Sequence, residues 1–129
     1  MKNAHRKRNL SRGSRIFYMR LEEKECADCG TEERLDEKRV KAYMKEVSGW
    51  KREGKKIRRE WEFKDFVEAM KFVNRVAELA EENSHHPDFQ IHWNKVLLEL
   101  WTHSKDGLTE NDFIVAAKIN GIGKDNDNR

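Results

Sequence analysis

The residues best suited to chemistry in this chain are histidines, which can both donate and accept protons near neutral pH. His85, His86 and His103 fall within nineteen residues, and Pro87, the only proline in the protein, directly follows the adjacent pair. An acidic residue, Glu81, precedes them by one helical turn. Such a concentration of imidazole and carboxylate groups indicates either acid–base chemistry or a metal site.

A metal site at these residues meets a geometric objection. Adjacent histidines point in different directions unless the backbone bends sharply, whereas a catalytic zinc usually takes three converging protein ligands. Here the three histidines would have to converge with Glu81. A simpler alternative places the histidines at the end of a helix, where an imidazolium complements the helix dipole. That explains one histidine better than three with a carboxylate, and on the residues alone the three interpretations stay open.

The first elements that would position these side chains follow from the spacing of apolar residues. Helical spacing predicts a first helix over residues 35–47. Alternating residues then predict a hairpin that starts at Trp50, turns at residues 53–55 and returns over residues 57–63. Asp65 is the expected N-cap of a second helix that runs to about Asn83, with Glu68 as its capping-box partner. The apolar stripe of this helix is expected to comprise Phe66, Ala69, Met70, Val73, Val76, Ala77 and Ala80.

The histidine pair is expected at the corner between the second helix and a strand. Pro87 biases His86 away from helical geometry, so a strand should follow over residues 89–93. Asn94 and Lys95 form a plausible two-residue turn into a strand over residues 96–103, which would carry His103 at its end. One face of that strand is apolar and packs on helices, while the other is partly open and bears a tryptophan, which suggests association with another subunit.

The last helix is specified by its first turn. Thr109 is the expected N-cap and Asp112 the acid that reaches back to it, while Leu108 and Phe113 form a hydrophobic staple. The helix should run to about residue 120 and end at Gly121. The predicted fold is therefore an α+β two-layer sandwich, a four-stranded antiparallel sheet with three helices on one face, in the order helix-strand-strand-helix-strand-strand-helix.

Composition and charge place this fold in one domain. The chain has 129 residues, 40% of them charged, and residues 1–20 hold seven Lys and Arg with no acidic residue. The remaining residues carry 20 basic against 24 acidic side chains, so any phosphate affinity should be confined to the N-terminal arm. We expect a basic disordered arm over residues 1–22, a domain over 23–121 and a frayed tail over 122–129. Neither a membrane span nor a secretory signal is evident, so we expect a cytoplasmic protein.

The two cysteines, Cys26 and Cys29, lie in a Cys-Ala-Asp-Cys-Gly segment. Structural zinc needs four ligands and a second cysteine pair is missing, so a complete site would need histidines from elsewhere. A redox dithiol normally starts a helix after a strand, and no strand is predicted before this segment. An incidental loop is the favoured interpretation, with metal and redox roles as alternatives.

Seven residues also match the pattern of a known family at every spacing. The pattern is an acidic residue, three positions, His, His or Asn, Pro, five positions, an aromatic residue, nine positions, His or Trp, then at least eight positions and Asp. In this respect the chain resembles the pterin-4a-carbinolamine dehydratases, over about residues 26–119. One mammalian member of that family also serves as a dimerisation cofactor of a homeodomain transcription factor. The matching residues are Glu81, His85, His86, Pro87, Trp93, His103 and Asp112.

The resemblance implies a hydro-lyase that dehydrates 4a-hydroxytetrahydrobiopterin, or a related 4a-hydroxytetrahydropterin, to the quinonoid dihydropterin. No metal or other cofactor is implied, because the reaction needs only an acid and a base. The three histidines would share the catalytic duties and contact the substrate. By the same resemblance, the substrate site would also be lined by Pro87, Thr102, Ser104 and Lys105.

The remaining residues of the pattern receive supporting roles. Glu81 either bonds a histidine or is a surface carboxylate, and Asp112 is favoured as a helix-capping acid over a chemical group. Trp50 and Trp93 are expected in the core, and His92 is treated as structural. We expect a homodimer or homotetramer. The alternatives are a non-catalytic interaction cofactor on the same fold and a nucleic-acid binder that acts through the basic arm.

Overall fold

The structure, a computed structural model, describes residues 20–26 and 32–127. Its helices and strands follow the predicted order, with two short 3-10 helices added. In chain order they are η3 (Leu21–Glu23), α1 (Glu37–Met44), β1 (Lys51–Glu53), β2 (Lys56–Glu62), α2 (Phe66–Asn83), β3 (Asp88–His92), β4 (Lys95–Leu100), η4 (His103–Lys105) and α3 (Glu110–Asp127).

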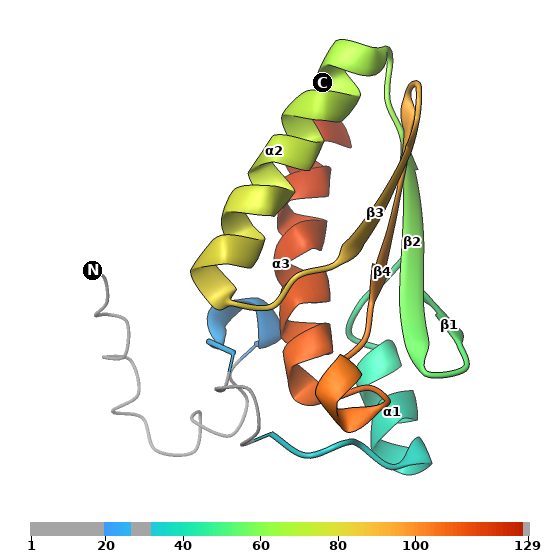
Figure 1. Ribbon diagram of the computed structural model, residues 1–129, viewed down its shortest axis with the longest axis vertical. Coiled ribbons are helices and arrows are strands. Elements are labelled where there is room, and N and C mark those ends of the chain that lie inside the picture. The colour runs from blue at the N-terminus through green and yellow to red at the C-terminus, as the bar shows by residue number, and fades with distance from the viewer. Residues whose placement is uncertain (1–19, 27–31, 128–129) are drawn as a thin grey trace.

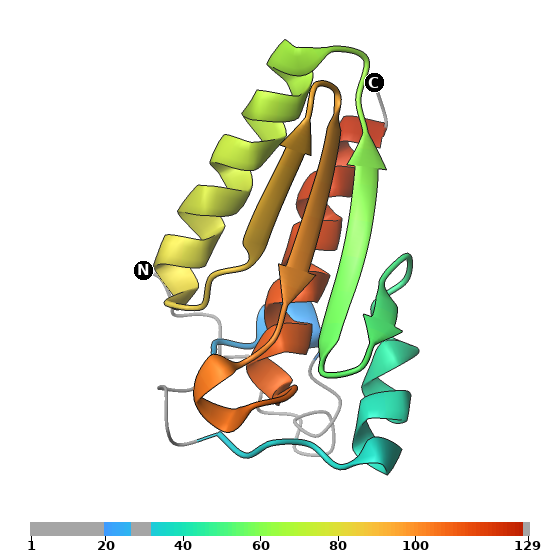
Figure 2. The ribbon, with the colours of Figure 1, turned by 45° about the vertical axis from the view of Figure 1, so that its right-hand side comes forward.

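The four strands form one antiparallel sheet in the order β1-β2-β4-β3. Two hairpins, β1-β2 and β3-β4, join through β2 and β4, so β1 and β3 are the edges (Figure 2). Helices α2 and α3 lie side by side on one face, and α1 lies beyond the end of the sheet next to β1 (Figure 1 and Figure 2). The predicted α+β sandwich is confirmed.

The core lies between the sheet and helices α2 and α3. Alternate residues of the central strands point into it, as the sequence predicts, because successive side chains of a strand face opposite sides. From α2, Phe72 is fully buried between the layers, and its burial contributes about 1.5–3 kcal/mol. The predicted stripe of α2 was partly wrong, because Phe66 and Ala77 are exposed and Phe72 is central. The buried residues of the two central strands are Ile57, Trp61, Val96, Leu97, Leu98 and Leu100.

Helix α2 begins and ends through specific caps. The Asp65 side chain accepts a hydrogen bond of 2.9 Å from the backbone N–H of Glu68, as predicted. At the other end, Ser84 adopts the left-handed conformation with φ of 51°. The backbone N–H of His85 then bonds to the carbonyl of Ala80 at 3.2 Å. This closure ends the helix immediately before the histidine pair, as the pattern predicted.

Two predicted boundaries in the second hairpin were wrong. His92 pairs with Lys95, so the turn consists of Trp93 and Asn94 rather than Asn94 and Lys95. Trp93 has φ of 54° and is 66% exposed, which contradicts its predicted place in the core, whereas Trp50 is buried as predicted. Strand β4 ends at residue 100, and His103 begins η4 instead of ending the strand.

The ends of the chain also differ from the sequence prediction. Helix α3 continues through Gly121 to Asp127, because neither Gly121 nor Gly123 turns into the left-handed conformation that ends a helix. The predicted arm, residues 1–22, lies outside the described residues except for its last three, and there Leu21 is already buried in the core. Within the described ranges, no helix is long and apolar enough to cross a membrane.

Candidate active site

The centre of the candidate site is a largely buried, hydrogen-bonded pair of an imidazole and a carboxylate, between the helix-to-strand corner and the start of α3. The Nε2 atom of His85 lies 2.6 Å from Oδ1 of Asp112. The His85 side chain is 12% exposed and that of Asp112 is fully buried. Burial lowers the effective dielectric constant, which strengthens such a pair, and the contact fixes the orientation of the imidazole.

The second oxygen of Asp112 caps helix α3. Oδ2 accepts hydrogen bonds from the backbone N–H of Thr109 at 3.0 Å and from the hydroxyl of Thr102 at 2.8 Å. The predicted capping role is therefore confirmed, and the contact with His85 is an additional role that the sequence prediction did not favour. A contact between residues 27 positions apart gives no local signal in a sequence.

His86 pairs with a different carboxylate from His85. Its Nε2 lies 2.7 Å from Oε2 of Glu81, and the two side chains are 56% and 78% exposed. Glu81 therefore bonds a histidine, which is one of the two predicted alternatives. The contact is exposed to solvent and contributes little stability. Pro87, by contrast, is buried at the corner and fixes where the strand begins.

His103 is exposed at the start of η4, next to Thr102. Its ring packs against Trp101 in a tilted arrangement, with ring centroids 3.9 Å apart and planes inclined by 36°. The ammonium of Lys55 lies 4.9 Å from the centre of the Trp101 ring, so the indole is also held by a cation–π contact. Trp101 therefore supports the position of His103, although only His103 belongs to the seven-residue pattern.

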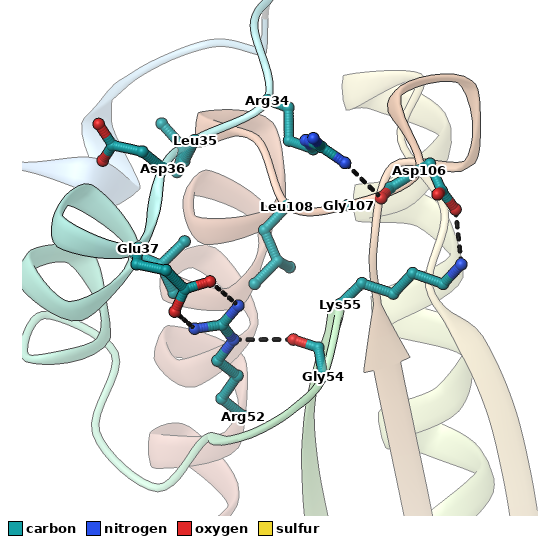
Figure 3. Close-up of a pocket in the computed structure, with 11 residues that line it drawn as sticks. Arg34, Leu35, Asp36, Glu37, Arg52, Gly54, Lys55, Asp106, Gly107 and Leu108 are labelled. Carbon is teal, nitrogen blue, oxygen red and sulfur yellow. Dashed lines mark hydrogen bonds and ion pairs between the residues drawn. The ribbon is translucent and has the colours of Figure 1, made fainter.

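The loop that carries His103 is tied to the rest of the fold at Asp106. Lys55 Nζ bonds Oδ1 of Asp106 at 2.5 Å, and Arg34 Nη1 donates to its carbonyl at 3.3 Å (Figure 3). The bond to Lys55 holds the pKa of the Asp106 carboxyl below its usual value. Nothing in the sequence indicated these contacts, because Lys55 is 51 residues away.

A cavity of about 470 Å³ adjoins this loop, and none of the predicted histidines lines it. Its charged groups already have partners, including the two hydrogen bonds of Arg52 to the carboxylate of Glu37 and the bond of Lys55 to Asp106 (Figure 3). We therefore assign the cavity to support of the loop rather than to chemistry. Its lining comprises Arg34, Leu35, Asp36, Glu37, Val40, Arg52, Gly54, Lys55, Asp106, Gly107 and Leu108.

The predicted site residues thus fall into three groups in the structure. Hydrogen bonds join His85, Asp112 and Thr102, and Thr102 is 3% exposed with its hydroxyl engaged. His86 and Glu81 form an exposed pair beside the corner. The third group is η4, which carries His103, Ser104 and Lys105. Thr102 directly precedes η4 and donates its hydroxyl to Asp112. His92 is exposed at the end of β3.

The metal alternative needs the three histidines to converge with Glu81, and the thiol alternative concerns Cys26 and Cys29. In residues 20–26 and 32–127, no three His, Cys, Asp or Glu side chains are grouped to hold a metal ion. Burial raises the pKa of the Cys26 thiol to about 12, so little of the thiolate that binds zinc or exchanges disulfides is present near neutral pH. This environment favours a structural role for Cys26. Cys29 lies outside the described residues.

An imidazole held by a buried carboxylate, with further exposed imidazoles at the same helix-to-strand corner and in the loop beyond β4, defines a candidate acid–base site on an α+β sandwich. The family model "Pterin 4 alpha carbinolamine dehydratase" matches residues 33–122. The chain belongs to this family, and the predicted resemblance is confirmed.

Individual relatives agree with this assignment. The chain is 50% identical over 86 residues to a Thermomicrobium roseum protein named for the same family, covering 67% of this chain and 92% of the relative. It is 40% identical over 119 residues to "Pterin-4-alpha-carbinolamine dehydratase 2, mitochondrial" of Arabidopsis thaliana, covering 85% and 64%. A crystal structure of "transcriptional coactivator/pterin dehydratase" from Brucella melitensis superposes with a TM-score of 0.67 at 36% identity, covering 69% of this chain and 97% of that one.

Proposed function

We propose that this protein is a hydro-lyase that dehydrates 4a-hydroxytetrahydrobiopterin, or a related 4a-hydroxytetrahydropterin, to the quinonoid dihydropterin. The observation that carries the proposal is the pair of His85 with the buried Asp112, in a chain of the pterin-4a-carbinolamine dehydratase family. A substrate of this kind arises when a hydroxylase uses its pterin, so the reaction would serve the recycling of that pterin.

The chemistry asks for two proton transfers. The bond between C4a and the hydroxyl oxygen breaks with its electron pair on oxygen, an acid protonates that oxygen, and water leaves. A base removes a proton from a pterin ring nitrogen, and the remaining electrons form a carbon–nitrogen double bond. Because no electrons leave or enter the substrate, the reaction requires no redox cofactor. Histidine suits both roles, because its ordinary pKa lies near neutral pH.

We propose that the three histidines divide the acid, base and orienting duties. His85 is the one with a fixed orientation, because Asp112 holds its Nε2 atom. His86 and His103 are exposed and can exchange protons with water as well as with substrate. The exposed Ser104 and the half-buried Lys105, both in η4, are proposed to contact the pterin beside His103. Pro87 and Thr102 are buried, so Pro87 would act through the backbone that it positions and Thr102 through its hydroxyl on Asp112.

The test is stopped-flow dehydration of a synthetic 4a-hydroxytetrahydropterin with the wild type and with His85→Ala, His86→Ala and His103→Ala. We expect acceleration over buffer by the wild type and a loss of about a hundredfold or more in the most affected variant. His92→Ala is the matched control, because His92 is exposed and outside the pattern. A wild type no faster than buffer would refute the enzyme assignment. Activity that survives each alanine but disappears with a chelator would favour the metal alternative instead.

A second candidate is an interaction cofactor that uses the same fold without catalysis. It is favoured by the Brucella structure, which is described as a transcriptional coactivator as well as a pterin dehydratase. We expect partner binding of that kind to survive His85→Ala and His103→Ala together, whereas dehydration should not. Co-purification of the double variant with any partner captured by the wild type separates the two functions.

We also propose that the chain forms a homodimer or homotetramer and works in the cytoplasm. Ile91 and Trp93, at the open edge of the sheet, are apolar and exposed, as expected of a surface that another subunit covers. Sedimentation velocity would test the assembly, since a monomer at micromolar concentration would contradict it. Fractionation of the source cells would test the location.

A further inference from the structure

We infer that the buried residues Thr102 and Thr109 are positioning residues that hold His85 in one tautomer, with its proton on Nε2, so that it exchanges protons with substrate through Nδ1. The inference rests on the proposed function for its substrate. The tautomer of His85 and the hydrogen bonds that fix it can be tested without an activity measurement.

Two hydrogen-bond donors fix the position of Oδ2 of Asp112. The backbone N–H of Thr109 donates to this oxygen at 3.0 Å, and the hydroxyl of Thr102 donates to it at 2.8 Å. All three residues are buried. A backbone N–H can only donate, so this oxygen must accept, and the carboxylate cannot turn without leaving the N–H at the start of α3 without its partner.

The two threonine hydroxyls donate their hydrogen bonds in one direction, toward Asp112. Thr102 has one hydroxyl proton and gives it to Asp112. In its 2.9 Å contact with Oγ1 of Thr109, Thr102 must therefore accept, so Thr109 donates. Two hydroxyls in series thus point toward the carboxylate, and each bond polarises the next in the same direction.

The other oxygen of Asp112, Oδ1, bonds to His85. With Oδ2 occupied by two donors, Oδ1 is the oxygen left to meet Nε2 of His85, at 2.6 Å. An ionised carboxylate only accepts hydrogen bonds, as Oδ2 does from its two donors, so the hydrogen in this contact lies on Nε2. Nε2 therefore carries hydrogen and the neutral ring has its lone pair on Nδ1. His85 can act as a base or acid toward substrate only through Nδ1.

The direct test is nitrogen-15 NMR of histidine-labelled full-length protein at a pH where His85 is neutral. We expect the wild type to show Nε2 of His85 as the protonated nitrogen, with a slowly exchanging Nε2 proton, and Nδ1 as the unprotonated one. Thr102→Val removes the hydroxyl but keeps the shape, and should shift both nitrogens toward the average of the two tautomers. Thr102→Ser restores the hydroxyl and should restore the wild-type spectrum.

Kinetics supply the second readout. Thr102→Val and Thr109→Val should lower kcat about tenfold to a hundredfold with little change in KM, because substrate contacts remain while the reacting nitrogen is less well defined. Thr102→Ser should recover most of kcat. The matched control is Val76→Ala, which weakens the core on α2 without touching these hydrogen bonds and should leave the tautomer unchanged.

The outcomes separate this inference from the proposed function. If the wild type protonates Nδ1, or if Thr102→Val leaves the tautomer as it was, the inference is overturned whatever the activity. If the tautomer behaves as expected but the wild type does not dehydrate the pterin, the positioning role stands and the proposed function falls. A spectrum that changes equally in Val76→Ala would show general loosening and would also overturn the inference.

Discussion

Asp112 shows how one buried side chain can serve folding and chemistry with separate oxygens. Oδ2 closes the first turn of α3 through Thr109, and Oδ1 holds His85. The cap gives the carboxylate a fixed position that does not depend on substrate. The fixed carboxylate in turn holds the imidazole of His85, so the orientation of this ring is set when the helix forms.

Asp112→Asn tests the two roles separately. The amide oxygen must face the N–H of Thr109, so the amide NH₂ must face Nε2 of His85 and donate to it, which forces the other tautomer. Every partner stays bonded, so we expect a loss of only about 1–2 kcal/mol in the free energy of unfolding. The activity should fall about a hundredfold. Urea denaturation and stopped-flow dehydration measure the two effects.

The control for this substitution is Asp88→Asn, which makes the same chemical change at an exposed position on β3. It should leave both stability and activity near the wild-type values. If Asp112→Asn also keeps nearly full activity while the fold is intact, Asp112 is a helix cap only, and its contact with His85 has no catalytic consequence.

At the scale of elements, the two glycines near the end of α3 have opposite requirements. A Cβ atom at Gly121 would meet nothing within 4 Å, whereas one at Gly123 would lie 2.5 Å from Nε1 of Trp61. Trp61 is buried, so its ring cannot move aside freely. The helix therefore needs a glycine where it crosses β2 and tolerates a larger residue one half-turn earlier.

This contrast predicts opposite effects of the same substitution. Gly121→Ala should raise the free energy of unfolding by about 0.5–1 kcal/mol, because alanine loses less backbone entropy in a helix. Gly123→Ala should lower it by about 1–3 kcal/mol, because the added methyl overpacks the contact with Trp61. Urea denaturation of the two variants compares them directly. If both were stabilising, α3 would not pack on Trp61 as described.

At this scale the sequence predicts well those features that depend on residues a few positions apart in the chain. The caps Asp65 and Thr109 and the corner at Pro87 follow from contacts a few residues apart, and they were predicted. Contacts across the fold give no local pattern. The link from His85 to Asp112 was therefore missed. Gly121 was read as a helix end by its residue type alone, although the helix continues.

At the scale of the whole molecule, charge and site are separated along the chain. Residues 1–19 hold six basic and no acidic side chains, and their removal would change the formal net charge from +3 to −3. The residues proposed to act on the pterin all lie between 81 and 112. A function of the basic segment in binding polyanions and a function of the site in dehydration should therefore respond to different changes.

Deletion of residues 1–19 tests this separation. The full chain should bind a DNA or RNA duplex weakly and only at low salt, because the basic side chains of this segment release counterions from phosphates. The shortened chain should show no such binding in fluorescence anisotropy, since its net charge is negative, yet dehydrate the pterin with an unchanged kcat/KM. A variant with the six Lys and Arg of the segment changed to Gln, at full length, is the matched control and should behave like the deletion. Duplex binding that persists in both variants would place a nucleic-acid surface on the folded domain and contradict the charge argument.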